Sequence, residues 1–114
     1  MLVAYTNGLE LIRALRPIVE AIRSHSAEMA KQVERAGTSI MLNVGEGSYR
    51  VGRDPKRFYA MAQGSAAEIR AALDTCEAWG WNVDTSNARA LLDRELGLLW
   101  GLTHPKAPKP QRTH

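Results

Sequence analysis

Apolar residues recur along the chain at steps of three and four, the spacing that places side chains on one face of a helix. The first pattern covers residues 7–24 and consists of Leu11, Ile12, Leu15, Ile18, Val19 and Ile22. Asn7, with Glu10 three residues later, is predicted to cap this helix. Pro17 is predicted to kink it near residues 13–17, because proline removes one backbone donor.

A second pattern follows the polar residues 24–26. Its apolar positions step by four, three, four and four, as in the seam of a helix bundle: Met29, Val33, Ala36, Ile40 and Val44. Gly45-Glu46-Gly47 predicts the end of this helix, since glycine adopts the left-handed C-terminal conformation at little steric cost. A loop over residues 48–53 is expected next.

Asp54-Pro55 predicts the start of a third helix, because a carboxylate can cap free N–H groups and proline is favoured at the first helical position. Its seam consists of Phe58, Ala62, Ser65, Ile69, Ala72, Cys76 and Trp79, and Gly80 is expected to close it. The small residues at 64–67 favour close approach of a neighbouring helix. The alternative is a locally weak helix, because glycine costs about 1 kcal/mol relative to alanine.

The fourth pattern is predicted to be capped by Asp84, Thr85 or Ser86 and to end before Pro105. Its large apolar side chains are Leu91, Leu92, Leu96, Leu98, Leu99, Trp100 and Leu102. They extend beyond one narrow stripe, so part of this helix is expected to face another subunit. Together the four segments predict an all-α fold, an antiparallel up-and-down four-helix bundle.

Length and composition fit one domain, since the chain has 114 residues and 45% of them are apolar. We predict a four-helix bundle over residues 1–103 and a flexible tail rich in proline and lysine over residues 104–114. No export signal and no membrane span are expected, because no stretch approaches the roughly 20 apolar residues that a span needs. Cys76 has no second cysteine to pair with, which fits a reducing cytoplasm. Its side chain is either a nucleophile or, as the apolar helical pattern around it favours, a buried core residue.

The positive charge of the chain is unevenly distributed. The formal net charge is +3, yet residues 1–103 contain 12 Lys and Arg and all 12 Asp and Glu, so the excess lies in the tail. The tail is either a solubilising end or a weak arm for phosphate.

One local concentration of cations precedes and enters the third helix. Arg50, Arg53, Lys56 and Arg57 stand against Asp54 alone. Cations beside a helix N-terminus can hold phosphate, which makes these four residues candidates for nucleic-acid binding. The alternative is an ordinary solvated loop.

No catalytic constellation is found in the sequence. His25, His104 and His114 share no helical face, and no Glu-x-x-His pair or phosphate loop occurs, so no metal and no cofactor is expected. Ser39 and Ser65 have no histidine at nearby spacing. We therefore predict a protein that is not an enzyme.

A family resemblance rests on residues 39–68. The motifs are Ser39-Ile-Met-Leu-Asn43-Val-Gly-Glu46-Gly47, a basic loop, Arg57-Phe58-Tyr59 and Gly64-Ser65-Ala-Ala-Glu68. Their order resembles the four-helix-bundle proteins encoded in intervening sequences of bacterial 23S ribosomal RNA genes. That family is related to the accessory variability determinant of diversity-generating retroelements, which partners a reverse transcriptase. The chain departs from the family pattern at Val44, usually isoleucine, and at Gly45, usually alanine.

The resemblance implies a barrel-like homopentamer with no known enzymatic activity, and a nucleic-acid role in the retroelement branch. It assigns packing and internal hydrogen bonding to the signature residues Ser39, Asn43, Glu46, Gly47, Gly64, Ser65 and Glu68. We predict an oligomeric, nucleic-acid-binding accessory protein, with RNA or DNA and a reverse transcriptase as partners. The alternative is a homo-oligomeric scaffold or protein-protein adaptor that binds no nucleic acid and uses the apolar face of the last helix or exposed tryptophans.

Overall fold

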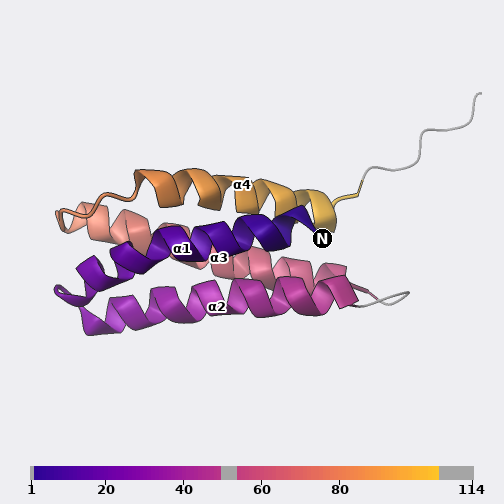
Figure 1. Ribbon diagram of the computed structural model, residues 1–114, viewed down its shortest axis with the longest axis horizontal. Coiled ribbons are helices and arrows are strands. Elements are labelled where there is room, and N and C mark those ends of the chain that lie inside the picture. The colour runs from indigo at the N-terminus through magenta and orange to yellow at the C-terminus, as the bar shows by residue number, and fades with distance from the viewer. Residues whose placement is uncertain (1, 50–53, 106–114) are drawn as a thin grey trace, which may run out of the picture.

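The computed structural model describes residues 2–49 and 54–105. They form four helices: α1 (Val3–Arg23), α2 (Ala27–Tyr49), α3 (Lys56–Ala78) and α4 (Ser86–Thr103), and the described residues include no strand (Figure 1). Each helix packs on the next, and α4 also packs on α1, so the four helices surround one core. The predicted all-α four-helix bundle is confirmed.

Consecutive helices run in opposite directions (Figure 1), and two contacts between α1 and α2 follow that order. Ile12 of α1 packs at Gly37 of α2, whereas Gly8, one turn earlier, packs at Met41, one turn later. The core between the helices is aliphatic, and its largest fully buried apolar side chains are Leu11, Ile22, Val33, Ile40, Val44, Ile69, Leu73, Cys76, Leu92 and Leu99.

The start of α1 differs from the prediction. The helix begins at Val3 with Leu2 at the N-cap, so the predicted cap at Asn7 is wrong. Asn7 lies within the helix and is buried, because its side-chain amide donates to groups of α4 rather than to the α1 backbone. The helix continues through Pro17 to Arg23 as a single element.

The predicted end of α2 at residues 45–47 is also wrong. The helix begins after Ser26, whose hydroxyl accepts from the Met29 backbone N–H at 3.1 Å, and it continues through both glycines to Tyr49. Gly47 serves close packing instead: a Cβ there would lie 2.7 Å from Cε1 of the buried Tyr59. Of the loop predicted over 48–53, residues 48 and 49 are helical and residues 50–53 lie outside the described residues.

The predicted end of α3 agrees with the structure, whereas its start lies one residue later than predicted, because the helix begins at Lys56 with Pro55, not Asp54, at the N-cap. Asp54 Oδ1 accepts from the Lys56 backbone N–H at 3.1 Å at the start. At the other end Gly80 has a φ of 77°, and the N–H groups of Gly80 and Trp81 donate to the carbonyls of Glu77 and Cys76. This is the Schellman arrangement that glycine permits.

Within the small-residue stretch of α3, the close approach involves Ser65 rather than Gly64. Ser65 Oγ donates to Ser39 Oγ at 2.9 Å, and Ala66 is fully buried. Gly64 lies on the exposed side, and a Cβ there would meet nothing within 4 Å. The prediction of close packing is therefore corrected at Gly64.

Helix α4 begins where predicted, at Ser86 with Thr85 as N-cap, although the Thr85 side chain makes no cap bond. In the preceding turn, Asp84 Oδ1 accepts from both the backbone N–H and the hydroxyl of Ser86. Its additional leucines pack against the core as partly buried residues: Leu91, Leu96, Leu98 and Leu102. Trp100 differs, with 54% of its surface exposed. The wide apolar surface is thus largely used within the chain.

Candidate functional site

The cations singled out in the sequence lie at one end of the bundle. The N-terminus, the end of α2, the start of α3 and the end of α4 all meet there (Figure 1), and we call it the basic end. Residues 50–57, which lead from α2 into the first turn of α3, and residues 104–114, after α4, together carry seven of the 15 Lys and Arg and one of the 12 Asp and Glu. The rest of the chain is formally −3. The helix ends that flank these two segments therefore lie at the same end of the bundle, although they are far apart in sequence.

Lys56 and Arg57 are the described members of the basic loop, and both are exposed in the first turn of α3. The Arg57 guanidinium lies over the Phe58 ring, 5.6 Å from its centroid. Because Asp54 already accepts from the Lys56 amide, an anion here would meet side-chain cations rather than an open helix terminus. Arg50 and Arg53 lie outside the described residues.

Several cations elsewhere are paired with acids. The described ion pairs are Arg13–Glu10, Arg23–Glu20, Arg23–Glu34, Arg89–Asp74 and Arg89–Glu77, with N–O distances from 2.6 to 3.4 Å. Near the end opposite the basic end (Figure 1), Arg23–Glu34 connects α1 to α2 and the two Arg89 pairs connect α4 to α3, whereas Arg23–Glu20 lies within α1. Their charge is locally balanced, so they offer little to a polyanion.

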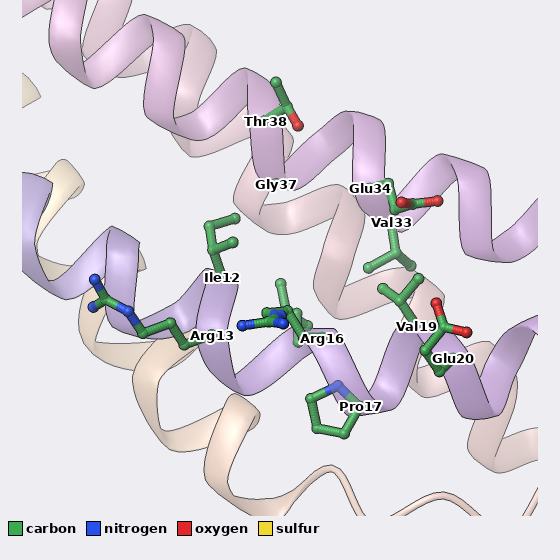
Figure 2. A pocket seen from close by; sticks show the side chains of 11 residues that line it. Ile12, Arg13, Arg16, Pro17, Val19, Glu20, Val33, Glu34, Gly37 and Thr38 are labelled. Atoms are coloured by element: carbon green, nitrogen blue, oxygen red, sulfur yellow. The ribbon is translucent and has the colours of Figure 1, made fainter.

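A groove of about 690 Å³ runs between α1 and α2 (Figure 2). Val19 and Val33 point toward each other across it, and Ile12 lies under Gly37, where a Cβ would be 2.8 Å from Ile12 Cδ1. Its rim carries both signs of charge, including Arg16 and the pair Glu20 and Glu34 that shares Arg23. This mixed rim does not select an anion.

Three of the signature residues form a polar cluster between α2 and α3. Asn43 Nδ2 donates to the Ser39 carbonyl at 2.9 Å and to Ser39 Oγ at 3.1 Å, and Ser65 donates to the same hydroxyl. The cluster is partly buried and links the two helices. Gly47 packs on Tyr59 as described above, whereas the other signature residues are exposed: Glu46, Gly64 and Glu68.

A buried carboxyl between α1 and α4 was missed by sequence reasoning. Glu95 is fully buried, and Asn7 Nδ2 donates to its Oε1 at 2.9 Å and to the Leu91 carbonyl at 3.1 Å. Glu95 Oε2 is buried and has no hydrogen-bond partner among the described residues. A Cβ at Gly8 would lie 3.1 Å from this oxygen and 2.6 Å from Met41 Sδ, so only glycine lets both side chains reach the α1 backbone.

Burial raises the pKa of the Glu95 carboxyl to about 7, and the hydrogen bond from Asn7 opposes that rise only in part. A signal for this residue was present in the sequence. Ala88, Leu92, Glu95 and Leu99 step by four, three and four, and the buried seam of α4 follows these positions. The sequence analysis considered only the large apolar side chains of this helix, so it passed over Ala88 and Glu95.

Other candidate chemistry does not assemble in the described residues. Cys76 is a buried free thiol, and burial raises its pKa, which disfavours the reactive thiolate. Across residues 2–49 and 54–105, no three His, Cys, Asp or Glu side chains gather as a metal site would require. In the same residues, no helix combines the length and apolarity needed to cross a membrane.

Fold and site together define a small four-helix bundle with exposed Lys56 and Arg57 at one end, and the interior of its described part holds one isolated carboxyl, Glu95. A family model described as 23S rRNA-intervening sequence protein matches residues 2–94, which is most of the chain. The protein belongs to that family. No match was found among curated proteins.

Proposed function

We propose that the protein is a non-enzymatic accessory protein that binds nucleic acid at the basic end. The observation that supports this is that the end of α2, the start of α3 with Lys56 and Arg57, and the end of α4 lie at one end of the bundle, and that the sequence following α2 and α4 is rich in Lys and Arg. Phosphate contacts by Lys and Arg supply most of the affinity of sequence-independent binding. The remaining surface, with its paired arginines and net negative charge, orients a polyanion toward this end.

Self-association is the second part of the proposal. Leu42 and Tyr49 are seven residues apart on the outer side of α2 and are 70% and 86% exposed. Large apolar side chains that share an exposed helix face are typical of subunit contacts. A ring of subunits, such as the homopentamer that the resemblance implies, would repeat the basic end and raise affinity through multivalency.

Charge-matched variants test nucleic-acid binding. Arg50, Arg53, Lys56 and Arg57 are replaced by alanine in one protein; the control replaces four exposed cations outside the basic end, Arg16, Lys31, Arg35 and Arg94. Both variants lose four positive charges, so they differ only in the position of the loss. Binding of a labelled RNA stem-loop and of a DNA duplex is measured by fluorescence anisotropy at several salt concentrations.

The basic-end variant should bind more weakly, and its plot of log K against log salt should flatten by about 0.7 to 0.9 for each phosphate that the variant no longer neutralises. The control variant should retain most of the affinity and slope. Equal losses of affinity in the two variants would show that binding depends on net charge and not on the basic end. Unchanged binding in the basic-end variant would refute the proposed site.

The alternative function is a scaffold or adaptor that binds no nucleic acid. The exposed Leu42 and Tyr49 favour it as much as they favour an oligomeric nucleic-acid-binding protein. Absence of binding to RNA and DNA in the salt series, together with a light-scattering mass above that of one 12.6 kDa chain, would select it. The reverse transcriptase implied by the resemblance is a further proposed partner, and co-elution of the two purified proteins tests it.

A further inference from the structure

The α3–α4 face at the basic end combines exposed cations with an exposed, immobilised aromatic ring. Lys56, Gln63 and Arg70 are seven residues apart, so they follow one side of α3. Gln63 Oε1 lies 3.5 Å from Thr103 Oγ1 of α4, which identifies this side as the one that borders α4. Within the described residues, no acid pairs with the side chain of Lys56 or Arg70.

The aromatic component comes from the last turn of α4. Trp100 precedes Thr103 by three residues and therefore lies on the same side of the helix. His104 stacks on its indole, with ring centroids 4.2 Å apart and planes inclined by 12°. His104 Nδ1 in turn lies 3.0 Å from the Trp100 carbonyl and 3.0 Å from Thr103 Oγ1, so three contacts hold the pair in place.

The stacked pair leaves much of the tryptophan open, since 54% of its surface is exposed. Along α3, Lys56 and Arg70 are about 21 Å apart at 1.5 Å per residue, and Trp100 lies on the neighbouring helix between their levels. That length matches about six nucleotides at a stacked spacing of 3.4 Å. Asp93 lies one heptad before Trp100 on the same side of α4. Its negative charge would repel phosphate, so the nucleic-acid-binding surface is expected to end before Asp93.

We propose that this face binds single-stranded nucleic acid, with an unpaired base stacked on Trp100 and the backbone held by Lys56 and Arg70. The proposal rests on the proposed function and specifies its substrate. A ring can stack only on a base whose face is free, so a base within a duplex cannot use Trp100. A surface with cations alone would bind the phosphates of single-stranded and double-stranded nucleic acid alike.

The test compares a fluorescein-labelled 12-nucleotide single strand, as RNA and as DNA, with the duplex of the same sequence. The full-length variants are Trp100→Ala, Trp100→Phe and Trp79→Ala. Trp79 is the matched control because it is 70% exposed and caps the other end of α3. Circular dichroism confirms folding, and light scattering measures the mass of each variant.

Trp100→Ala should weaken single-strand binding about tenfold, the loss expected for one stacked base. Trp100→Phe should restore most of that loss, and Trp79→Ala should have no effect. Duplex binding, where it occurs, should be weaker than single-strand binding and unchanged in all three variants.

Equal losses for single strand and duplex in Trp100→Ala, or no loss for either, would overturn the stacking proposal and leave the proposed function standing. A change of oligomeric mass in Trp100→Ala would also overturn it, by placing the ring between subunits. Absence of wild-type binding to every probe would overturn the proposed function itself.

Discussion

Replacing Glu95 with glutamine probes a carboxyl that is fully buried without a cation among the described residues. Glutamine keeps the volume of the side chain and an oxygen that accepts from Asn7 Nδ2, but it cannot ionise. No charge of either sign offsets the burial of Glu95, since desolvation dominates its environment and Asn7 is its only hydrogen-bonding side chain among the described residues. The substitution therefore isolates the cost of ionising this position.

The magnitude follows from the two pKa values. The carboxyl titrates near 4.5 when unfolded and at about 7 when folded, so between these pH values the unfolded chain releases a proton that the folded chain keeps. Stability is therefore fully present below pH 4.5, falls as the pH rises to about 7, and then levels off. The total loss from this group is about 3 kcal/mol, at 1.36 kcal/mol per pKa unit.

Urea unfolding followed by circular dichroism from pH 4.5 to pH 8 gives the free energy of unfolding for wild type and variant. The difference between them should grow by about 3 kcal/mol across this range, with Glu95→Gln the more stable protein at pH 8. Asp93→Asn is the control, because it removes one exposed carboxyl from the same helix and should parallel wild type. Measurements at two protein concentrations separate any contribution from self-association.

A constant difference between wild type and Glu95→Gln across the pH range would refute the reasoning. It would mean that the carboxyl titrates alike in the folded and unfolded chains, through solvent access or a partner. A variant less stable than wild type at pH 8 would refute it as well.

Three further predictions concern backbone and packing. Gly47→Ala should destabilise the protein by about 1–3 kcal/mol in urea unfolding, because its Cβ would overlap the Tyr59 ring. Gly64→Ala, which meets open space within a helix, should stabilise the protein by about 0.5–1 kcal/mol. Equal effects of the two substitutions would contradict the packing assigned to Gly47. Gly80→Ala should cost about 1 kcal/mol, since the native φ of 77° disfavours a side chain, and an unchanged melting temperature would argue against the left-handed turn. Ser26→Ala should cost about 1 kcal/mol through loss of the cap on the Met29 amide, and Ser26→Asp should restore most of it.

The sequence alone determined the helical elements and most of their boundaries. Apolar steps of three and four depend only on helix geometry, so they identify Val33, Ile40 and Val44 as a buried stripe without knowledge of the partner helix. The sequence also located the turns at Asp54, Asp84 and Gly80 to within a residue of the helix ends, because such a turn is formed by residues adjacent in sequence.

Only the tertiary structure decided the roles that depend on distant partners. In the sequence, Gly47 predicts a helix end, yet in the structure it leaves room for the Tyr59 ring of the next helix. In the sequence, Asn7 predicts a helix N-cap, yet in the structure its side-chain amide donates a hydrogen bond to Glu95, which is 88 residues away. The basic end has the same origin, since the start of α3 and the end of α4 come to the same end of the bundle only when four helices of similar length fold back on one another. A local pattern records the period of a helix but not the identity of the residue that will pack against it.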